Sequence, residues 1–112
     1  MADAHRRLAE DNGFAVTADG YPAWQGRPDN PLALLMDGVY RRETGRSMTI
    51  SAVHVGLEPS LFHVKAPELV MAVAGPDILD AHSPDERAPL ASLPDYAALL
   101  AGTLEEIGRQ RD

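Results

Sequence analysis

Residues 82–87, HSPDER, bring together side chains that can bind a metal ion, because His82 is followed closely by Asp85 and Glu86. They come after the apolar stretch LVMAVA and a Gly-Pro step. In open α/β sheets, ligands bind beyond the carboxyl ends of the strands. A neutral imidazole is a common zinc ligand, and carboxylates orient such ligands through hydrogen bonds. One interpretation is therefore that His82 is a metal ligand, which Asp85 and Glu86 orient or support by hydrogen bonds. The alternative is that His82 is an ordinary surface histidine and SPDE a turn or a helix start.

A second candidate stretch is HVGLE, residues 54–58, which also follows a segment with strand-like alternation. If the two strands are parallel, both loops open on the same edge, and His54, Glu58 and His82 could converge there. The alternative is a histidine at a strand end and a solvated glutamate. One histidine makes neither a metal site nor an active site, so the residues themselves leave the choice open.

Three segments have the pattern of helices: residues 2–12, 31–44 and 93–108. The second is the clearest, since Asn30 can cap it, Pro31 suits its first position and Gly45 ends it. For the third, Ser92 and Asp95 have the spacing of a capping box.

Three further segments have the pattern of strands: residues 14–21, 47–54 and 69–74. Residues 47–54 alternate apolar and polar side chains, as in a half-buried strand. Residues 69–74 are continuously apolar, which suits a central strand covered on both faces. Residues 56–67 between them indicate a loop with a helical turn. The expected fold class is therefore α/β, a layered unit with a small sheet.

Composition excludes several classes of function. With a formal net charge of −7, the chain repels phosphate backbones, so nucleic acid is not an expected partner. The absence of cysteine excludes disulfides, cysteine-ligated zinc and a thiol nucleophile. No apolar run approaches the roughly 18 residues of a membrane span, and the first residues lack the apolar region of a secretory signal. A cytoplasmic chain without a membrane partner is expected.

Three stretches in order carry a resemblance to a known family. GYPAW at 20–24 leads to PDNPL at 28–32, HVGLE follows at 54–58, and GP is followed after five residues by HSPDE. Their order and spacing resemble the C-terminal end of the aminoacyl-histidine dipeptidases, the Xaa-His, carnosinase-like members of the di-zinc exopeptidase superfamily.

The resemblance implies a role for each candidate residue. His82 would be the last protein ligand to one zinc of a two-zinc site. Asp85 and Glu86 would orient it by hydrogen bonds. His54 and Glu58 would lie in a loop facing the active site and help to bind the substrate. The family usually continues HxGLE with Cys-Gly, whereas this chain has Pro59 and Ser60, which puts the substrate preference in doubt.

The resemblance also implies a domain organisation. Residues 1–20 would be the end of a lid domain that often dimerises. Residues 21–112 would be the C-terminal portion of a layered catalytic domain, whose mixed or mostly parallel sheet is flanked by helices. A homodimer is then a possible assembly.

The same resemblance exposes what the chain lacks. The family takes its other metal ligands and its catalytic base from an N-terminal half, through a His-x-Asp, a bridging Asp and a Glu-Glu pair, none of which is recognisable here. We therefore expect no catalytic residue in this chain and at most one zinc ligand. The expected function is that of a C-terminal fragment of a dipeptidase acting on Xaa-His dipeptides, inactive alone and partnered by the remainder of the catalytic domain. The alternative is a non-catalytic α/β interaction module or partner subunit.

Overall fold

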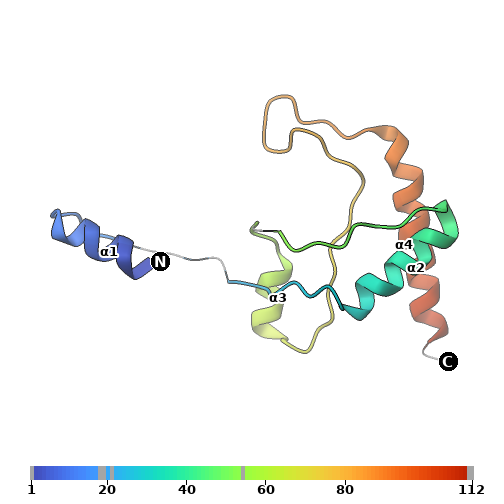
Figure 1. Cartoon of the computed structure of the whole chain (residues 1–112), viewed down its shortest axis with the longest axis horizontal. Coiled ribbons are helices and arrows are strands. Elements are labelled where there is room, and N and C mark those ends of the chain that lie inside the picture. Colours follow the sequence, from blue (N-terminus) through green and yellow to red (C-terminus); the bar gives the residue numbers. More distant parts are fainter. Residues whose placement is uncertain (1, 18–19, 21, 54, 111–112) are drawn as a thin grey trace. The chain divides into compact units, whose positions relative to one another are not determined.

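The computed structural model describes residues 2–17, 20, 22–53 and 55–110. The helices appear in Figure 1 and are α1 (Ala2–Asp11), α2 (Pro31–Thr44), α3 (Pro59–Lys65), the short 3-10 helix η1 (Leu90–Ser92) and α4 (Leu93–Arg109). The chain divides into two compact units, Met1–Trp24 with Gly56–Pro67, and Gln25–Val55 with Glu68–Asp112. In the described part, no helix is long and apolar enough to cross a membrane.

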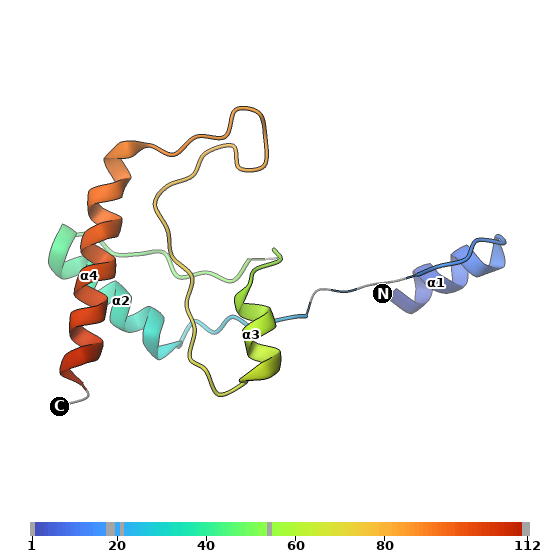
Figure 2. The same cartoon turned by 180° about the vertical axis from the view of Figure 1, so that it is seen from behind.

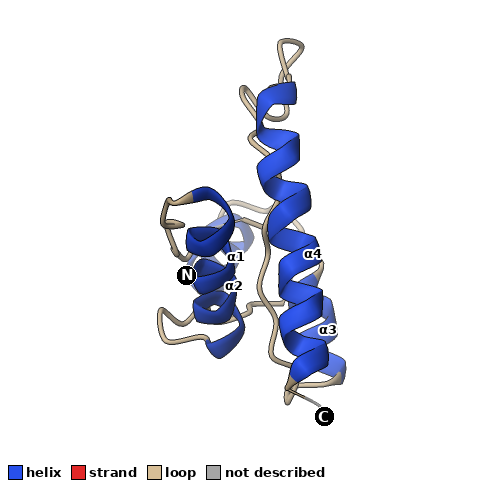
Figure 3. Ribbon diagram, turned by 90° about the vertical axis from the view of Figure 1, so that its right-hand side faces the viewer, coloured by secondary structure: helices blue, strands red, loops and turns tan. Residues whose placement is uncertain are grey.

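The predicted α/β fold class is wrong for this chain. The described residues are helical or irregular, and none belongs to a strand (Figure 3). Residues 47–53 and 69–74 make hydrogen bonds to side chains where a sheet would have backbone partners. The Met48 N–H donates to Asp37 Oδ1 at 2.7 Å, and the Met71 carbonyl accepts from Asn30 Nδ2 at 2.7 Å. An apolar pattern favours burial, but a strand also needs a neighbour for its backbone groups.

Helix α2 has the predicted bounds, 31–44, and the predicted caps. Asn30 Oδ1 accepts the N–H groups of Leu32 and Ala33 at 2.9 and 3.2 Å. At the other end, Gly45 takes the left-handed conformation with φ +71° and donates its N–H to the Arg41 carbonyl at 2.9 Å. Since these signals lie within a few residues of each terminus, the sequence alone predicts this helix.

The core of the second unit lies where α2 packs against α4 (Figure 1). Val39 from α2 and Leu99 from α4 are the buried apolar side chains of the described residues, 2% and 4% exposed. Gly102 lets the two helices approach closely, because a Cβ there would lie 2.7 Å from Val39 Cγ1. This core is small, so much apolar surface stays exposed elsewhere in the unit.

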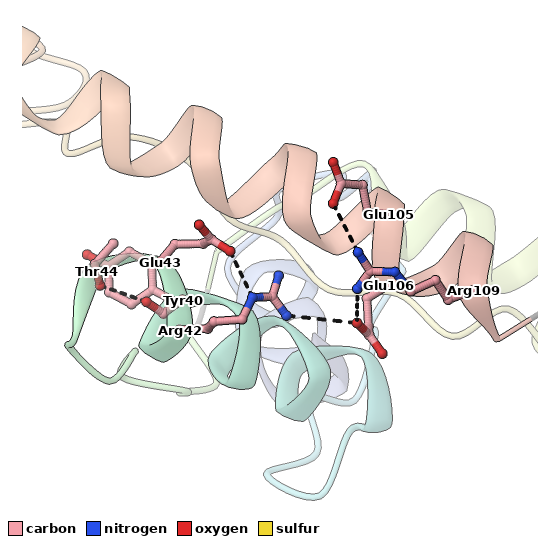
Figure 4. A network of polar contacts seen from close by, with 7 residues as sticks. All are labelled: Tyr40, Arg42, Glu43, Thr44, Glu105, Glu106 and Arg109. Carbon is pink, nitrogen blue, oxygen red and sulfur yellow. Dashed lines mark hydrogen bonds and ion pairs between the residues drawn. The ribbon is translucent and has the colours of Figure 1, made fainter.

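Arginines and glutamates line the edge of the α2–α4 contact (Figure 4). Arg42 lies 2.8 Å from Glu43 and 3.8 Å from Glu106, and Arg109 lies 3.2 Å from Glu106 and 3.5 Å from Glu105. Such partly exposed pairs contribute about 0–1 kcal/mol each. Of these pairs, the one between Arg42 and Glu106 joins the two helices.

The predicted capping box at the start of α4 is wrong. The Ser92 hydroxyl donates to the Pro89 carbonyl at 2.8 Å and accepts the Asp77 N–H at 3.1 Å, so it makes no cap bond to its own helix. The Asp95 carboxylate instead pairs with the Arg46 guanidinium. Helix α4 nevertheless has close to the predicted bounds, ending one residue later at Arg109.

Asp37 joins α2 to the segment that follows it. Its carboxylate accepts the Met48 N–H at 2.7 Å and pairs with Arg41 at 2.6 Å. These contacts lower the pKa of Asp37, first through the bond from Met48 and then through Arg41, against the opposing effect of burial. The ionised form therefore stabilises the turn back from α2.

The first unit contains α1 and α3. Helix α1 ends one residue before the predicted position, and Gly13 with φ +78° follows it. The predicted strand 14–21 is absent from its described residues, 14–17 and 20. The predicted loop 56–67 contains α3, a helix of seven residues. The predicted domain boundary near residue 20 stays a prediction.

Candidate functional site

The HSPDER segment lies in a loop closed by one pair of residues. The Leu79 N–H donates to the Arg87 carbonyl at 2.9 Å, and the Arg87 N–H donates to the Leu79 carbonyl at 3.1 Å. This antiparallel bridge encloses residues 80–86. Figure 2 shows the loop as a rounded hairpin clear of α2 and α4.

Ser83 organises the interior of the loop as a turn. Its N–H and its hydroxyl both donate to the Asp80 carbonyl, at 3.2 and 2.7 Å. Its hydroxyl also accepts the Asp85 N–H at 3.2 Å, and its carbonyl accepts the Glu86 N–H at 3.1 Å. Local bonds of this kind are why serine and aspartate are favoured in turns.

His82 has an unusual backbone conformation within this turn. Its φ is +64°, and that of Asp80 is +53°, so both lie in the left-handed region without being glycine. This region costs a non-glycine residue about 1–2 kcal/mol. The His82 N–H donates to Glu86 Oε2 at 2.9 Å, while its side chain is exposed. Glu86 therefore holds the backbone of His82, and the imidazole is left accessible.

Arg87 and Asp80 are residues that the sequence analysis did not select. The Arg87 guanidinium forms an ion pair with the Asp80 carboxylate, and its Nη1 also donates to the Asp85 carbonyl at 3.3 Å. A signal was present, because an aspartate and an arginine of opposite charge flank HSPDE on its two sides. The signal could not be used without knowing that residues 79 and 87 pair.

The second predicted group consists of His54 and Glu58. His54 lies outside the described residues. Glu58 precedes α3 in the first unit, where its side chain is exposed and makes no cap bond. Its carbonyl accepts the Leu61 N–H at 2.9 Å. The expected convergence of Glu58 with His82 stays a prediction, since the two residues belong to different units.

The donor set fits one zinc ligand but not a zinc site. In the described part of the chain, no group of three or more histidine, aspartate or glutamate side chains could hold a metal ion. A catalytic zinc normally takes three protein ligands and keeps one position open for water. His82 offers one accessible imidazole, which is fewer than the three protein ligands of such a site.

Comparison with known proteins identifies a relative. Over 108 residues, the chain is 37% identical to the cytosol non-specific dipeptidase of Escherichia coli strain K12. The match covers 96% of this chain and 22% of that protein, so the chain spans about a fifth of the relative's length. No family model matches the chain. No solved structure matches it either. The resemblance to dipeptidases that the motifs predict is confirmed.

Proposed function

We propose that this chain is the C-terminal part of the catalytic domain of a metal-dependent, cytoplasmic dipeptidase that accepts Xaa-His dipeptides. The observation that carries the proposal is the 37% identity to a dipeptidase over nearly the whole chain. The HSPDE and HxGLE motifs support it, because they are the stretches that carry the family's resemblance. Residues 1–20 would be the end of a lid domain, through which the complete enzyme could form a homodimer.

In this proposal, His82 contributes one imidazole nitrogen to a zinc ion, and the remaining ligands come from outside the chain. A bound zinc pair would supply Lewis-acid chemistry, by which the pKa of a water molecule is lowered toward neutral pH. Glu86 keeps the His82 backbone in place through its 2.9 Å bond. Glu58 and His54 would lie near the amino end of the dipeptide, where a carboxylate can pair with an ammonium group.

The exposed apolar side chains support a partner that completes the domain. Leu69, Val70 and Val73 are 49%, 55% and 54% exposed, although their segment is almost continuously apolar. Burying the exposed half of these three side chains would stabilise the assembly by about 2–4 kcal/mol. The remainder of a dipeptidase catalytic domain is the partner we propose for this surface.

A chimera tests the proposal directly. The stretch of the Escherichia coli dipeptidase that aligns with this chain is replaced by residues 1–112, and hydrolysis of Ala-His is measured with zinc present. We expect activity in the chimera, and at least a hundredfold lower kcat/KM after His82→Ala. His5→Ala, which changes an exposed histidine in α1, is the matched control and should leave activity unchanged. A folded, zinc-loaded chimera without activity, or one indifferent to His82→Ala, would contradict the proposal.

The chain alone is expected to hydrolyse nothing and to self-associate through its exposed apolar surface. Sedimentation velocity should show aggregates or dimers, and Val70→Ser with Val73→Ser should shift the material toward monomer. A monodisperse wild-type chain whose stability ignores zinc would instead favour a non-catalytic partner subunit.

A further inference from the structure

Resting on the proposed function, we infer that Arg87 and Asp80 are positioning residues for His82. Together with Glu86, they form a clasp, defined here as the Arg87–Asp80 ion pair, the Leu79–Arg87 bridge and the bond from the His82 N–H to Glu86. The clasp holds His82 in a left-handed backbone conformation and so fixes the direction in which its imidazole can reach a zinc ion.

The first step of the argument is that the His82 conformation needs external support. A non-glycine residue takes φ +64° only where surrounding contacts over-determine it, and such residues gather at functional sites. Ser83 makes turn bonds with Asp80, Asp85 and Glu86, but none of these bonds reaches His82. The bond that holds His82 itself is the one from its N–H to the Glu86 carboxylate.

The second step is that the Glu86 carboxylate can hold His82 only while the Glu86 backbone stays in place, beside the bridge that closes the loop. On one side, the Glu86 N–H donates to the Ser83 carbonyl at 3.1 Å. Arg87, the next residue, fixes the other side. Its backbone makes both bonds of the bridge to Leu79, and its guanidinium joins the Asp80 carboxylate to the Asp85 carbonyl. One side chain thus ties both ends of the loop, at Asp80 and at Asp85, on either side of His82.

The third step concerns exposure. The Arg87 and Asp80 side chains are 60% and 53% exposed, so the ion pair stabilises the fold little. We therefore infer that the Arg87–Asp80 pair serves to fix the conformation of the loop more than to stabilise the fold. Groups that orient a metal ligand typically change metal affinity by 10–100-fold when removed.

The test begins with residues 1–112 carrying Val70→Ser and Val73→Ser, the two substitutions expected to keep the chain monomeric. A strong intraresidue HN–Hα NOE at His82 reports its positive φ in NMR spectra. We expect this NOE in that background, its loss when Arg87→Ala or Glu86→Ala is added, and its retention with Glu86→Gln, because an amide oxygen still accepts the N–H. Arg109→Ala removes an equally exposed arginine from α4 and is the matched control.

The second measurement is zinc affinity in the chimera, by competition with a chelator. Arg87→Ala should weaken zinc binding by about 10-fold or more, and Arg87→Lys should restore part of it. An unchanged His82 NOE in Arg87→Ala would overturn the clasp whatever the enzyme does. A lost NOE with unchanged zinc affinity would overturn its link to the metal. A chimera that fails to bind zinc while the NOE depends on Arg87 would overturn the proposed function and keep the clasp.

Discussion

The packing of α2 against α4 makes a sharp prediction for Gly102→Ala. Alanine is favoured over glycine inside a helix by about 1 kcal/mol, so the substitution would stabilise an isolated α4. In the structure, however, the new Cβ would lie 2.7 Å from Val39 Cγ1 and 3.1 Å from Arg42 Nη2. Carbon atoms pack best at roughly 3.5–4.0 Å, so the helices must part by about 1 Å or Val39 must change rotamer.

The size of the effect follows from these distances. Arg42 can move its flexible end, but Val39 is 2% exposed and β-branched, which leaves it one preferred rotamer in a helix. Overpacking of this kind costs about 1–3 kcal/mol. Gly38→Ala in the middle of α2 is the matched control, since nothing lies within 4 Å of its added Cβ. The propensity gain is the same in both variants, so Gly102→Ala should be less stable than Gly38→Ala by about 1–3 kcal/mol.

The assay is urea unfolding followed through the methyl resonances of Val39 and Leu99, which report the α2–α4 contact alone. A double-mutant cycle with Val39→Ala gives a second check, because removing Cγ1 relieves the overlap and should produce a coupling of about 0.5–3 kcal/mol. If Gly102→Ala proves as stable as Gly38→Ala, the close helix approach is wrong. If the cycle shows no coupling, Val39 Cγ1 is not the atom that the added Cβ of residue 102 overlaps.

Three further substitutions test how α2 and α4 are tied to the rest of the second unit. Asn30→Ala removes the cap and the bond to Met71, and should cost about 1–3 kcal/mol in urea unfolding. The pKa of Asp37 is lowered by Met48 and Arg41. Its ionised form therefore stabilises the fold at any pH above the ordinary pKa of 3.8. This stabilisation is lost as the pH falls through the lower pKa of the folded state. Asp37→Asn should therefore be less stable at neutral pH and lose less on acidification, and an unchanged acid transition would refute this. Ser92→Ala should leave the amide exchange of the first turn of α4 unchanged, because the hydroxyl does not cap it; faster exchange there would contradict the observed bonds.

The sequence selects His82, Asp85 and Glu86 from HSPDER, and their roles stay predictions. The resemblance to dipeptidases that this motif helps to carry is confirmed by the comparison. The sequence did not show which group Glu86 contacts. In the structure, its carboxylate accepts the backbone N–H of His82. Nor did the sequence indicate a role for Arg87, because its partners depend on the pairing of residues 79 and 87.

The sequence by itself determined α2, and it placed α1 and α4 to within one residue, whereas α3 lies in a segment predicted as a loop. Residues 31–44 were predicted to the residue, since a helix satisfies its backbone through bonds four residues apart and its caps lie beside its ends. The strands predicted at 47–54 and 69–74 are absent from the described residues of these segments. An apolar pattern indicates burial, whereas a strand requires a distant partner for its N–H and C=O groups. Only the tertiary structure could decide the left-handed backbone of His82. That conformation depends on the bond to Glu86 and on the loop that Arg87 closes. The spacing of residue types along the sequence does not predict these contacts.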